Sequence, residues 1–273
     1  FTYIDQCEFQ NHITGAVNIY NAYPGVHITN SGSYLVDHYV DNTYRAFFIS
    51  RSDDSLTFMN NIIEVRNPNH TANYEPLQMN NCNNSGRVSG KHWVANNAIT
   101  VVGYGPIVGL EHVNGDNFEY VHNTFILKSI RNKYRVLGVD LGFGSTPHFQ
   151  NNNFELEGLP NSTQFFTGSS SSSATYSFSS HNNNFHHNGV RFMYFHNKTY
   201  STIQEVRDSL GLDTNSMSHP SGLYVSENSL SLCGTPMDSG LFHPKFPVDL
   251  LGQTRNTSRP TIGAFEVGLG NQP

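Results

Sequence analysis

The stretch Phe149-Gln150-Asn151-Asn152-Asn153-Phe154 places a cluster of asparagine residues between two aromatic residues. Four other segments repeat this order of apolar residue, asparagine cluster and apolar residue: Phe58–Ile62, Trp93–Ile99, Tyr120–Phe125 and Phe178–Phe185. The final apolar residues of the five copies recur at intervals of roughly 26–37 residues, which is the range of solenoid and propeller repeats. The repeat therefore decides the fold class.

A parallel β-helix explains why asparagine recurs. Each turn of such a solenoid stacks on the previous one, and side chains alternate inward and outward along its strands. An asparagine at a corner can turn inward and satisfy backbone groups that would otherwise be buried without partners. A propeller blade usually needs a longer period with four strands, and a sandwich has no reason to repeat asparagine at one place. We therefore predict an all-β parallel β-helix with a corner ladder of Asn61, Asn97, Asn123, Asn152 and Asn183.

Two earlier segments, Tyr3–Phe9 and Val26–Tyr34, fit the pattern less well and are expected to form further turns. The copies also differ in length and spacing. In a solenoid, such insertions form loops on one face, which is often the binding face.

The amino-acid composition argues against two classes of protein, those that bind nucleic acid through a basic surface and those that span a membrane with a helix. Only 13% of the 273 residues are charged, against roughly 25% in an average domain. The net charge of −6 provides no basic field for nucleic acid. No stretch approaches the roughly 18 apolar residues of a membrane span. The three cysteines, Cys7, Cys82 and Cys233, do not form a complete disulfide framework.

Five N-glycosylation sequons are consistent with an extracellular or cell-surface protein. Each has the pattern Asn-X-Ser/Thr, which is an acceptor in exported chains. The candidate attachment residues are Asn69, Asn83, Asn161, Asn197 and Asn256.

The repeats stop after Tyr194-Phe195, which divides the chain into solenoid turns over residues 1–198 and a capping segment over residues 199–273. The capping segment begins with a predicted helix over residues 199–211. Ser201 or Thr202 would cap its start, with Glu205 in the position of a capping box, and Gly211 would end it.

The capping segment contains a series of motifs in a fixed order: Tyr200–Ile203, Gly211–Ser216, Pro220, Leu230–Gly240, Asp249–Arg255 and Pro260–Glu266. In this order the segment resembles the tail of bacterial exported right-handed parallel β-helix repeat proteins, which have a pectate-lyase-like superfold. The resemblance covers roughly the last 75 residues and implies a right-handed solenoid. It departs from the family pattern at Thr235, where Ser is common, and at Thr261, where Asp is common.

The resemblance does not select an activity, because the family includes polysaccharide lyases, hydrolases and adhesin-like proteins. In the tail, Asp249, Arg255 and Glu266 are expected to form a turn and ion-pair network. That network would help to cover the last turn, as terminal repeats require.

The strongest candidate for a catalytic cluster is basic. Arg131, Lys133 and Arg135 alternate along a predicted strand, so they could line one face, and Asp140 follows. A β-helix lyase would use such a base, together with Ca²⁺ to neutralise a uronate carboxylate. The alternative is a solvated loop between turns. Lys91 and His92, beside Trp93, form a weaker candidate.

A glycoside hydrolase would instead need two carboxylates about 5–9.5 Å apart. The acids considered within the repeats are Asp53, Asp54, Asp116, Glu119 and Asp140, and no pair stands out. The histidines His122, His148, His181, His186 and His187 lack the spacing of a zinc site and are interpreted as wall or corner residues. No metal or cofactor is predicted, apart from Ca²⁺ in the case of a lyase.

The sequence thus favours an extracellular protein with a structural or adhesive role that contacts polysaccharides or other glycans. Phe1 already has the character of a strand residue, so we expect a mature product, a fragment or the ordered part of a longer chain. An uncapped first turn would favour self-association, with subunits stacking end to end into fibres. The alternative function is a polysaccharide lyase or glycoside hydrolase that uses Lys133, Arg135 and Asp140.

Overall fold

The computed structural model describes residues 2–12, 15–22, 25–36, 38–40, 42–52, 55–82, 91–142, 144–168, 178–220, 223–226, 229–232 and 239–266. The sequence predictions for Phe1, Asp53, Asp54, Asn83 and Cys233 lie outside the described residues. Those described residues contain no helix that is long and apolar enough to cross a membrane.

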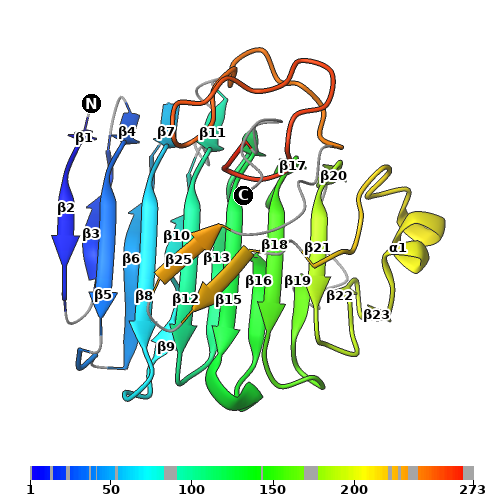
Figure 1. The fold of residues 1–273 in the computed structure, drawn as a ribbon, viewed down its shortest axis with the longest axis horizontal. Coiled ribbons are helices and arrows are strands. Elements are labelled where there is room, and N and C mark those ends of the chain that lie inside the picture. Colours follow the sequence, from blue (N-terminus) through cyan, green and yellow to red (C-terminus); the bar gives the residue numbers. More distant parts are fainter. Residues whose placement is uncertain are drawn as a thin grey trace.

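The chain winds into a parallel β-solenoid with three faces, and each turn adds a strand to each face (Figure 1). Sheet A contains β1 (Thr2–Asp5), β4 (Gly25–Thr29), β7 (Ser55–Met59), β11 (His92–Ala95), β14 (Phe118–Val121), β17 (His148–Gln150) and β20 (Ser179–His181). Sheet B contains β2 (Glu8–Gln10), β5 (Gly32–Val36), β8 (Ile62–Asn67), β12 (Ala98–Gly103), β15 (Thr124–Ser129), β18 (Asn153–Glu157) and β21 (Asn184–His187).

Sheet C forms the third face, and one of its strands is interrupted within one turn. It contains β3 (Gly15–Tyr20), β6 (Thr43–Ser50), β9 (Asn73–Tyr74), β10 (Leu77–Asn80), β13 (Ile107–Val113), β16 (Val136–Leu141), β19 (Gln164–Gly168), β22 (Met193–Phe195) and β23 (Lys198–Tyr200). The break between β9 and β10 falls at Pro76, which has no N–H to donate to a ladder. The predicted all-β solenoid is confirmed, including the two early turns at β1–β2 and β4–β5.

The predicted asparagine ladder lies inside the corner between sheets A and B. Asn123 shows the pattern: its Oδ1 accepts from the backbone N–H and the side chain of Asn97 at 3.1 and 2.9 Å. Its Nδ2 donates to the Val94 carbonyl and to Asn152 Oδ1 at 2.8 and 2.9 Å. Asn61, Asn97, Asn152 and Asn183 make corresponding bonds.

Serine replaces asparagine at both ends of this ladder. Ser31 N donates to Asn61 Oδ1 at 3.0 Å, and Asn183 N donates to Ser216 Oγ at 3.0 Å. The ladder therefore continues beyond Phe195, where the sequence predicts that the pattern stops. Thr214 and Met217 still form parallel bridges to sheets A and B, so Ser216 occupies the ladder position of one further, irregular corner.

The residue before each ladder position adopts a left-handed conformation, with φ between 49° and 61°. Asparagine tolerates this region better than most residues because its short polar side chain can bond locally. The left-handed residues are Gln6, Asn30, Asn60, Asn96, His122, Asn151, Asn182 and Asn215. In each Asn-Asn pair, the first residue therefore forms the turn of the corner, and the second fills the interior of the corner.

Aromatic side chains stack along the interior between successive turns. Phe125 and Phe154 lie with ring centroids 4.7 Å apart and planes 4° apart, and Tyr120 stacks on Phe149 at 4.8 Å. These side chains are fully buried. Burying rings of this size supplies much of the hydrophobic stabilisation that the sparsely charged sequence needs.

One end of the solenoid is covered by β23 and by α1 (Ile203–Leu210) (Figure 1). Thr202 caps the helix by accepting from Glu205 N, and Gly211 ends it with φ 67°, as predicted. Glu205 also accepts from Ser201 N at 2.6 Å. The side chain of Val206 is fully buried, so the helix packs onto the last turn.

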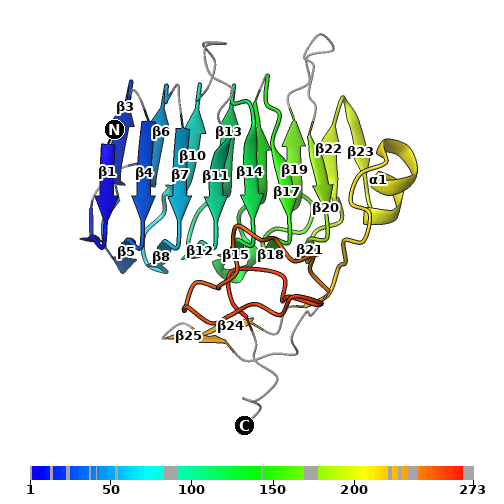
Figure 2. The ribbon, with the colours of Figure 1, turned by 90° about the horizontal axis from the view of Figure 1, so that it is seen from above.

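After the hairpin of β24 (Leu223–Ser226) and β25 (Ser229–Leu232), residues 239–266 return along the corner between sheets A and B (Figure 2). The left-handed asparagines hold this tail. Asn151 bonds both the N–H and the carbonyl of Leu241 at 2.9 and 2.6 Å, and Asn96 donates to the Val248 carbonyl at 2.9 Å.

The tail network expected of Asp249, Arg255 and Glu266 is confirmed. Arg255 is buried and donates to Glu266 Oε2 at 3.4 Å and to Asn96 Oδ1 at 3.0 Å. Asp249 accepts from three backbone N–H groups, including that of Glu266 at 2.7 Å. These residues therefore serve to fold the tail and to fix it to the solenoid.

Candidate functional site

Two carboxylates lie side by side on the outer face of sheet C. Glu111 on β13 and Asp140 on β16 are partners in the parallel register. Their neighbours Leu110 and Val139 are buried in the core, and alternation along each strand therefore directs the two acids outward. Neighbouring strands are about 4.8 Å apart, so the two side chains leave the sheet at adjacent positions.

A third acid and an arginine adjoin this pair. Arg45 donates through Nε to Glu75 Oε2 at 2.8 Å and forms an ion pair with the same oxygen at 2.7 Å. Gln78 is the register partner of Glu111 on β10 and hydrogen bonds to it. The Oε1 atom of Gln78 is buried and has no partner in the described part of the chain. The face thus contains polar groups that the fold leaves incompletely satisfied.

Burial, reinforced by the charges of Glu75 and Asp140, raises the pKa of Glu111 to about 7, against the lowering effects of Arg45 and Gln78. Burial also raises the pKa of Asp140, whereas Arg135 favours its ionised form. Near neutral pH, Glu111 can therefore hold and release a proton beside a second carboxylate. We call Glu75, Gln78, Glu111, Asp140, Arg45 and Arg135 the sheet C cluster.

The prediction that Arg131, Lys133 and Arg135 line one strand face is wrong. Ile130–Asn132 forms a 3₁₀ turn, η1, and β16 begins only at Val136. Arg131 and Asn132 both have positive φ, 60° and 49°, so the chain reverses where the sequence predicted a strand. Of the predicted catalytic residues, Arg135 and Asp140 belong to the sheet C cluster, and Lys133 belongs to another surface.

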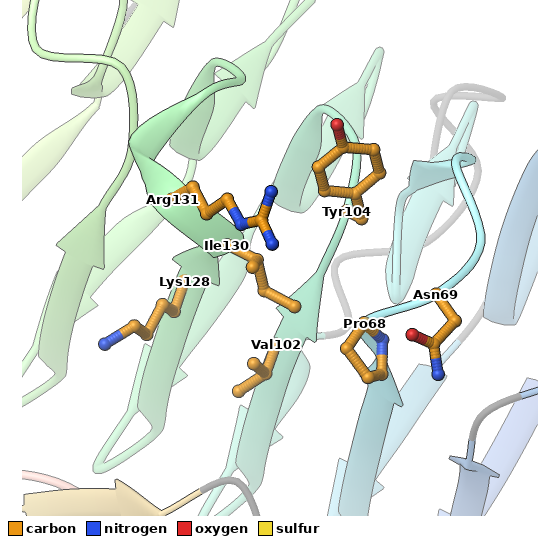
Figure 3. A pocket seen from close by; sticks show the side chains of 7 residues that line it. All are labelled: Pro68, Asn69, Val102, Tyr104, Lys128, Ile130 and Arg131. Atoms are coloured by element: carbon orange, nitrogen blue, oxygen red, sulfur yellow. The ribbon is translucent and has the colours of Figure 1, made fainter.

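That other surface is an open groove of about 530 Å³ at the corner where sheets B and C meet (Figure 3). Lys133 adjoins the groove by donating to the hydroxyl of Tyr104 at 2.7 Å. We call this site the basic groove, and it is lined by Pro68, Asn69, Val102, Tyr104, Lys128, Ile130 and Arg131.

The weaker basic candidate, Lys91-His92, lies on sheet A. Lys91 forms an ion pair with Glu119, whose other oxygen bonds His148 Nδ1 at 2.5 Å. His92 is buried and accepts from Leu56 N at 3.0 Å, and burial lowers its pKa to about 4.

The neighbouring Trp93 is a contact for the tail. Lys245 Nζ lies 3.7 Å from its ring centroid, and the ring of Phe246 lies 5.3 Å away. Phe246 is buried against Ala95 and Val121 of sheet A. This face therefore holds the tail in place.

The remaining predicted residues are dispersed. Asp116 lies between β13 of sheet C and β14 of sheet A, and it accepts from Thr146 Oγ1 at 3.2 Å. The sequon residues Asn69, Asn161, Asn197 and Asn256 are all exposed, and Asn69 also lines the basic groove.

The histidines do not converge on a metal site. His122 is buried at a corner, and His148 and His181 approach each other through Nε2 and Nδ1 at 3.3 Å. Among the residues that the structure describes, no group of three or more histidine, cysteine or acidic side chains could hold a metal ion.

Four members of the sheet C cluster are not predicted by the sequence: Glu75, Gln78, Glu111 and Arg45. No local motif marks these residues, and only the register of β6, β10, β13 and β16 brings them to one place. Their only sequence signal is a polar or charged side chain within a repeat.

No protein-family model matches the chain, and no curated protein or solved structure shows a significant match to it. The resemblance of the tail to exported β-helix proteins therefore stays a prediction.

Proposed function

We propose that this protein is a glycoside hydrolase that cleaves a polysaccharide on the outer face of sheet C. The proposal rests on the register pairing of Glu111 with Asp140, together with the different surroundings of the two carboxyl groups. Pairs of acids whose environments separate their roles are the usual apparatus of glycoside hydrolysis.

In the proposed reaction, Glu111 is the general acid. With a pKa of about 7 it retains its proton in neutral and mildly acidic solution, and it passes that proton to the glycosidic oxygen as the bond breaks. Asp140 is the second carboxylate: burial and Glu75 raise its pKa, and Arg135 opposes this shift by favouring the ionised form. It either attacks the anomeric carbon or activates the water that does so, depending on the separation of the two groups.

The other members of the sheet C cluster position this pair. Glu75 raises the pKa of Glu111, and its ion pair with Arg45 fixes the orientation of the carboxylate. Gln78 holds Glu111 by a hydrogen bond, while its buried Oε1 is left to accept from a hydroxyl group. Sugar hydroxyls provide such donors.

A lyase is less well supported. Elimination next to a uronate needs a strong base near the acidic carbon, and the sequence offered Lys133 for this role. Lys133 bonds Tyr104 at the basic groove and precedes β16, whereas Asp140 lies near the end of that strand.

The test is a screen of neutral and acidic polysaccharides for release of reducing ends, with ultraviolet absorbance to detect the unsaturated product of a lyase. Glu111→Gln and Asp140→Asn should each lower the hydrolysis rate by about 100-fold or more. Glu8→Gln, an exposed acid on sheet B, is the matched control and should retain full activity. Full activity in Glu111→Gln, or an unsaturated product, would refute the proposal.

We also propose an extracellular location, supported by the exposed sequon residues. Expression through a secretory pathway followed by glycosidase treatment should increase the mobility of the protein on a gel, and unchanged mobility would remove this support. If no polysaccharide is cleaved, a structural or adhesive role becomes the preferred hypothesis. The C-terminal end of the solenoid is covered by α1, so stacking through two open ends gains no support here.

A further inference from the structure

Positive charge gathers at the basic groove although the chain as a whole is acidic. The net charge is −6 with 15 basic residues, yet Lys128 and Arg131 line this groove and Lys133 adjoins it. Lys128 is paired with Glu157 at 2.9 Å, which offsets one charge. Arg131 and Lys133 are both exposed, and their charges are therefore available to an anion.

Aromatic rings lie beside these cations. The rings of Tyr104 and Tyr134 meet edge to face at 5.3 Å, and Lys133 Nζ lies 5.0 and 5.6 Å from their centroids. The hydrogen bond from Lys133 to the Tyr104 hydroxyl fixes the ammonium at the rim of the groove. A ligand that enters here meets a flat apolar ring and a positive charge together.

The turn that presents Arg131 is strained. Arg131 and Asn132 are consecutive residues in the left-handed region, and a bulky residue such as arginine rarely adopts it. Such strain is often found at ligand-binding positions. Figure 3 shows the guanidinium of Arg131 extending from η1 across the groove towards Tyr104.

We propose that the basic groove binds an anionic saccharide. Its volume of about 530 Å³ lies within the roughly 300–1,000 Å³ of small-molecule sites. The planar guanidinium of Arg131 suits a carboxylate or sulfate group, which it can bind through two parallel hydrogen bonds. The sugar ring then lies against Tyr104, and Lys133 adds a second positive charge. A neutral sugar gains the ring contact alone.

This binding site is separate from the sheet C cluster and does not depend on the proposed hydrolysis. Lys133 precedes β16, and Asp140 follows the first residue of that strand by four residues, or about 13 Å of extended chain. Binding can therefore be measured in a variant that lacks the proposed general acid.

The experiment is isothermal titration calorimetry with three probes of equal length: a uronate oligosaccharide, a sulfated oligosaccharide and a neutral oligosaccharide. We expect saturable binding of an anionic probe that weakens as salt is added, and no measurable binding of the neutral one. Preference for the uronate or for the sulfated probe identifies the source of the anion.

Two variants test the residues. Lys133→Met and Arg131→Gly should each weaken binding of the anionic probe by about 10-fold. Arg131→Gly also relieves the strained backbone, so circular dichroism and thermal unfolding should show an intact fold. Lys198→Met is the matched control, because Lys198 lies 4.8 Å over the Tyr200 ring on another surface.

Glu111→Gln should bind the anionic probe as tightly as the unmodified protein, whether or not it hydrolyses anything. Equal binding of the neutral probe would overturn the proposal. So would affinity for the anionic probes that does not change in Lys133→Met and Arg131→Gly.

Discussion

The corner between sheets A and B and the outer face of sheet C both contain polar side chains on successive turns, but the hydrogen bonding of these side chains differs. In the corner, Asn123 makes four hydrogen bonds to its neighbours and is completely buried. On sheet C, Glu111 adjoins two other acids and Gln78 leaves an oxygen without a partner in the described chain. The side chain of the ladder residue Asn123 is fully hydrogen bonded and serves the structure, whereas the acids on sheet C, whose pKa values are raised, are candidates for chemistry.

Breaking the corner should have the largest effect on stability. Asn123→Ala removes four bonds and leaves buried donors and acceptors without partners, at a cost of about 3–5 kcal/mol. The measurement is the free energy of unfolding in urea. Asn182→Gly is the control, because this residue keeps its left-handed φ of 54° and loses only a 3.4 Å bond to Ser239. Similar losses in both variants would mean that the ladder bonds contribute little.

Replacing Glu111 on sheet C should have the opposite effect on stability above pH 7. The folded protein binds a proton at Glu111 with a pKa of about 7, against 4.5 for an ordinary glutamate. Its contribution to stability is therefore complete below pH 4.5 and is lost as the pH rises through 7.

Glu111→Gln should remove this decline, so that above pH 7 the variant is more stable than the unmodified protein by about 1–2 kcal/mol, after allowance for partial exposure. Unfolding midpoints across this pH range provide the measurement. A variant that is less stable at every pH would assign Glu111 to the framework of the solenoid.

Glu119 lies on sheet A, and its replacement should have the smallest effect on stability of the three changes. Its burial would raise the pKa, but hydrogen bonds from His148 and Lys91 outweigh burial and lower the pKa to about 2. Its stabilising contribution is thus present above pH 4.5 and is lost as the pH falls towards 2. Glu119→Gln should cost about 1 kcal/mol at neutral pH, because the partners are partly exposed. A variant as stable as the parent at pH 7 would contradict this assignment.

The sequence predicted the ladder because its residues carry a local signature, an asparagine or a group of asparagines between apolar residues. The two proposed catalytic acids carry none. Glu111 follows Asn97 by fourteen residues, whereas Asp140 follows Asn123 by seventeen, because the η1 turn lengthens that part of the chain. Counting from one ladder residue to the next therefore fails to align the two acids, and only the strand register does so.

The basic candidate failed for a related reason. Alternation along a strand predicts that Arg131, Lys133 and Arg135 share one face, but the left-handed residues Arg131 and Asn132 interrupt that strand. Asparagine tolerates the left-handed conformation, so Asn132 is compatible with a turn. Arginine rarely adopts this conformation, so Arg131 gives no sequence signal for one. The sequence could locate a basic segment but could not show that it divides between two surfaces.

The return of the tail along the corner restricts how the solenoid can change its length during evolution. Asn96, Asn151 and Asn182 each bond a different part of residues 239–248, and the first two lie two turns apart. Deleting one turn between them would displace the binding partners of the tail by about 4.8 Å. Met59 of β7 also packs against the cluster that contains Phe246 of the tail. Turns can therefore be gained or lost before β7 without disturbing the tail, whereas the number of turns between β7 and β20 is fixed by the segment that spans them.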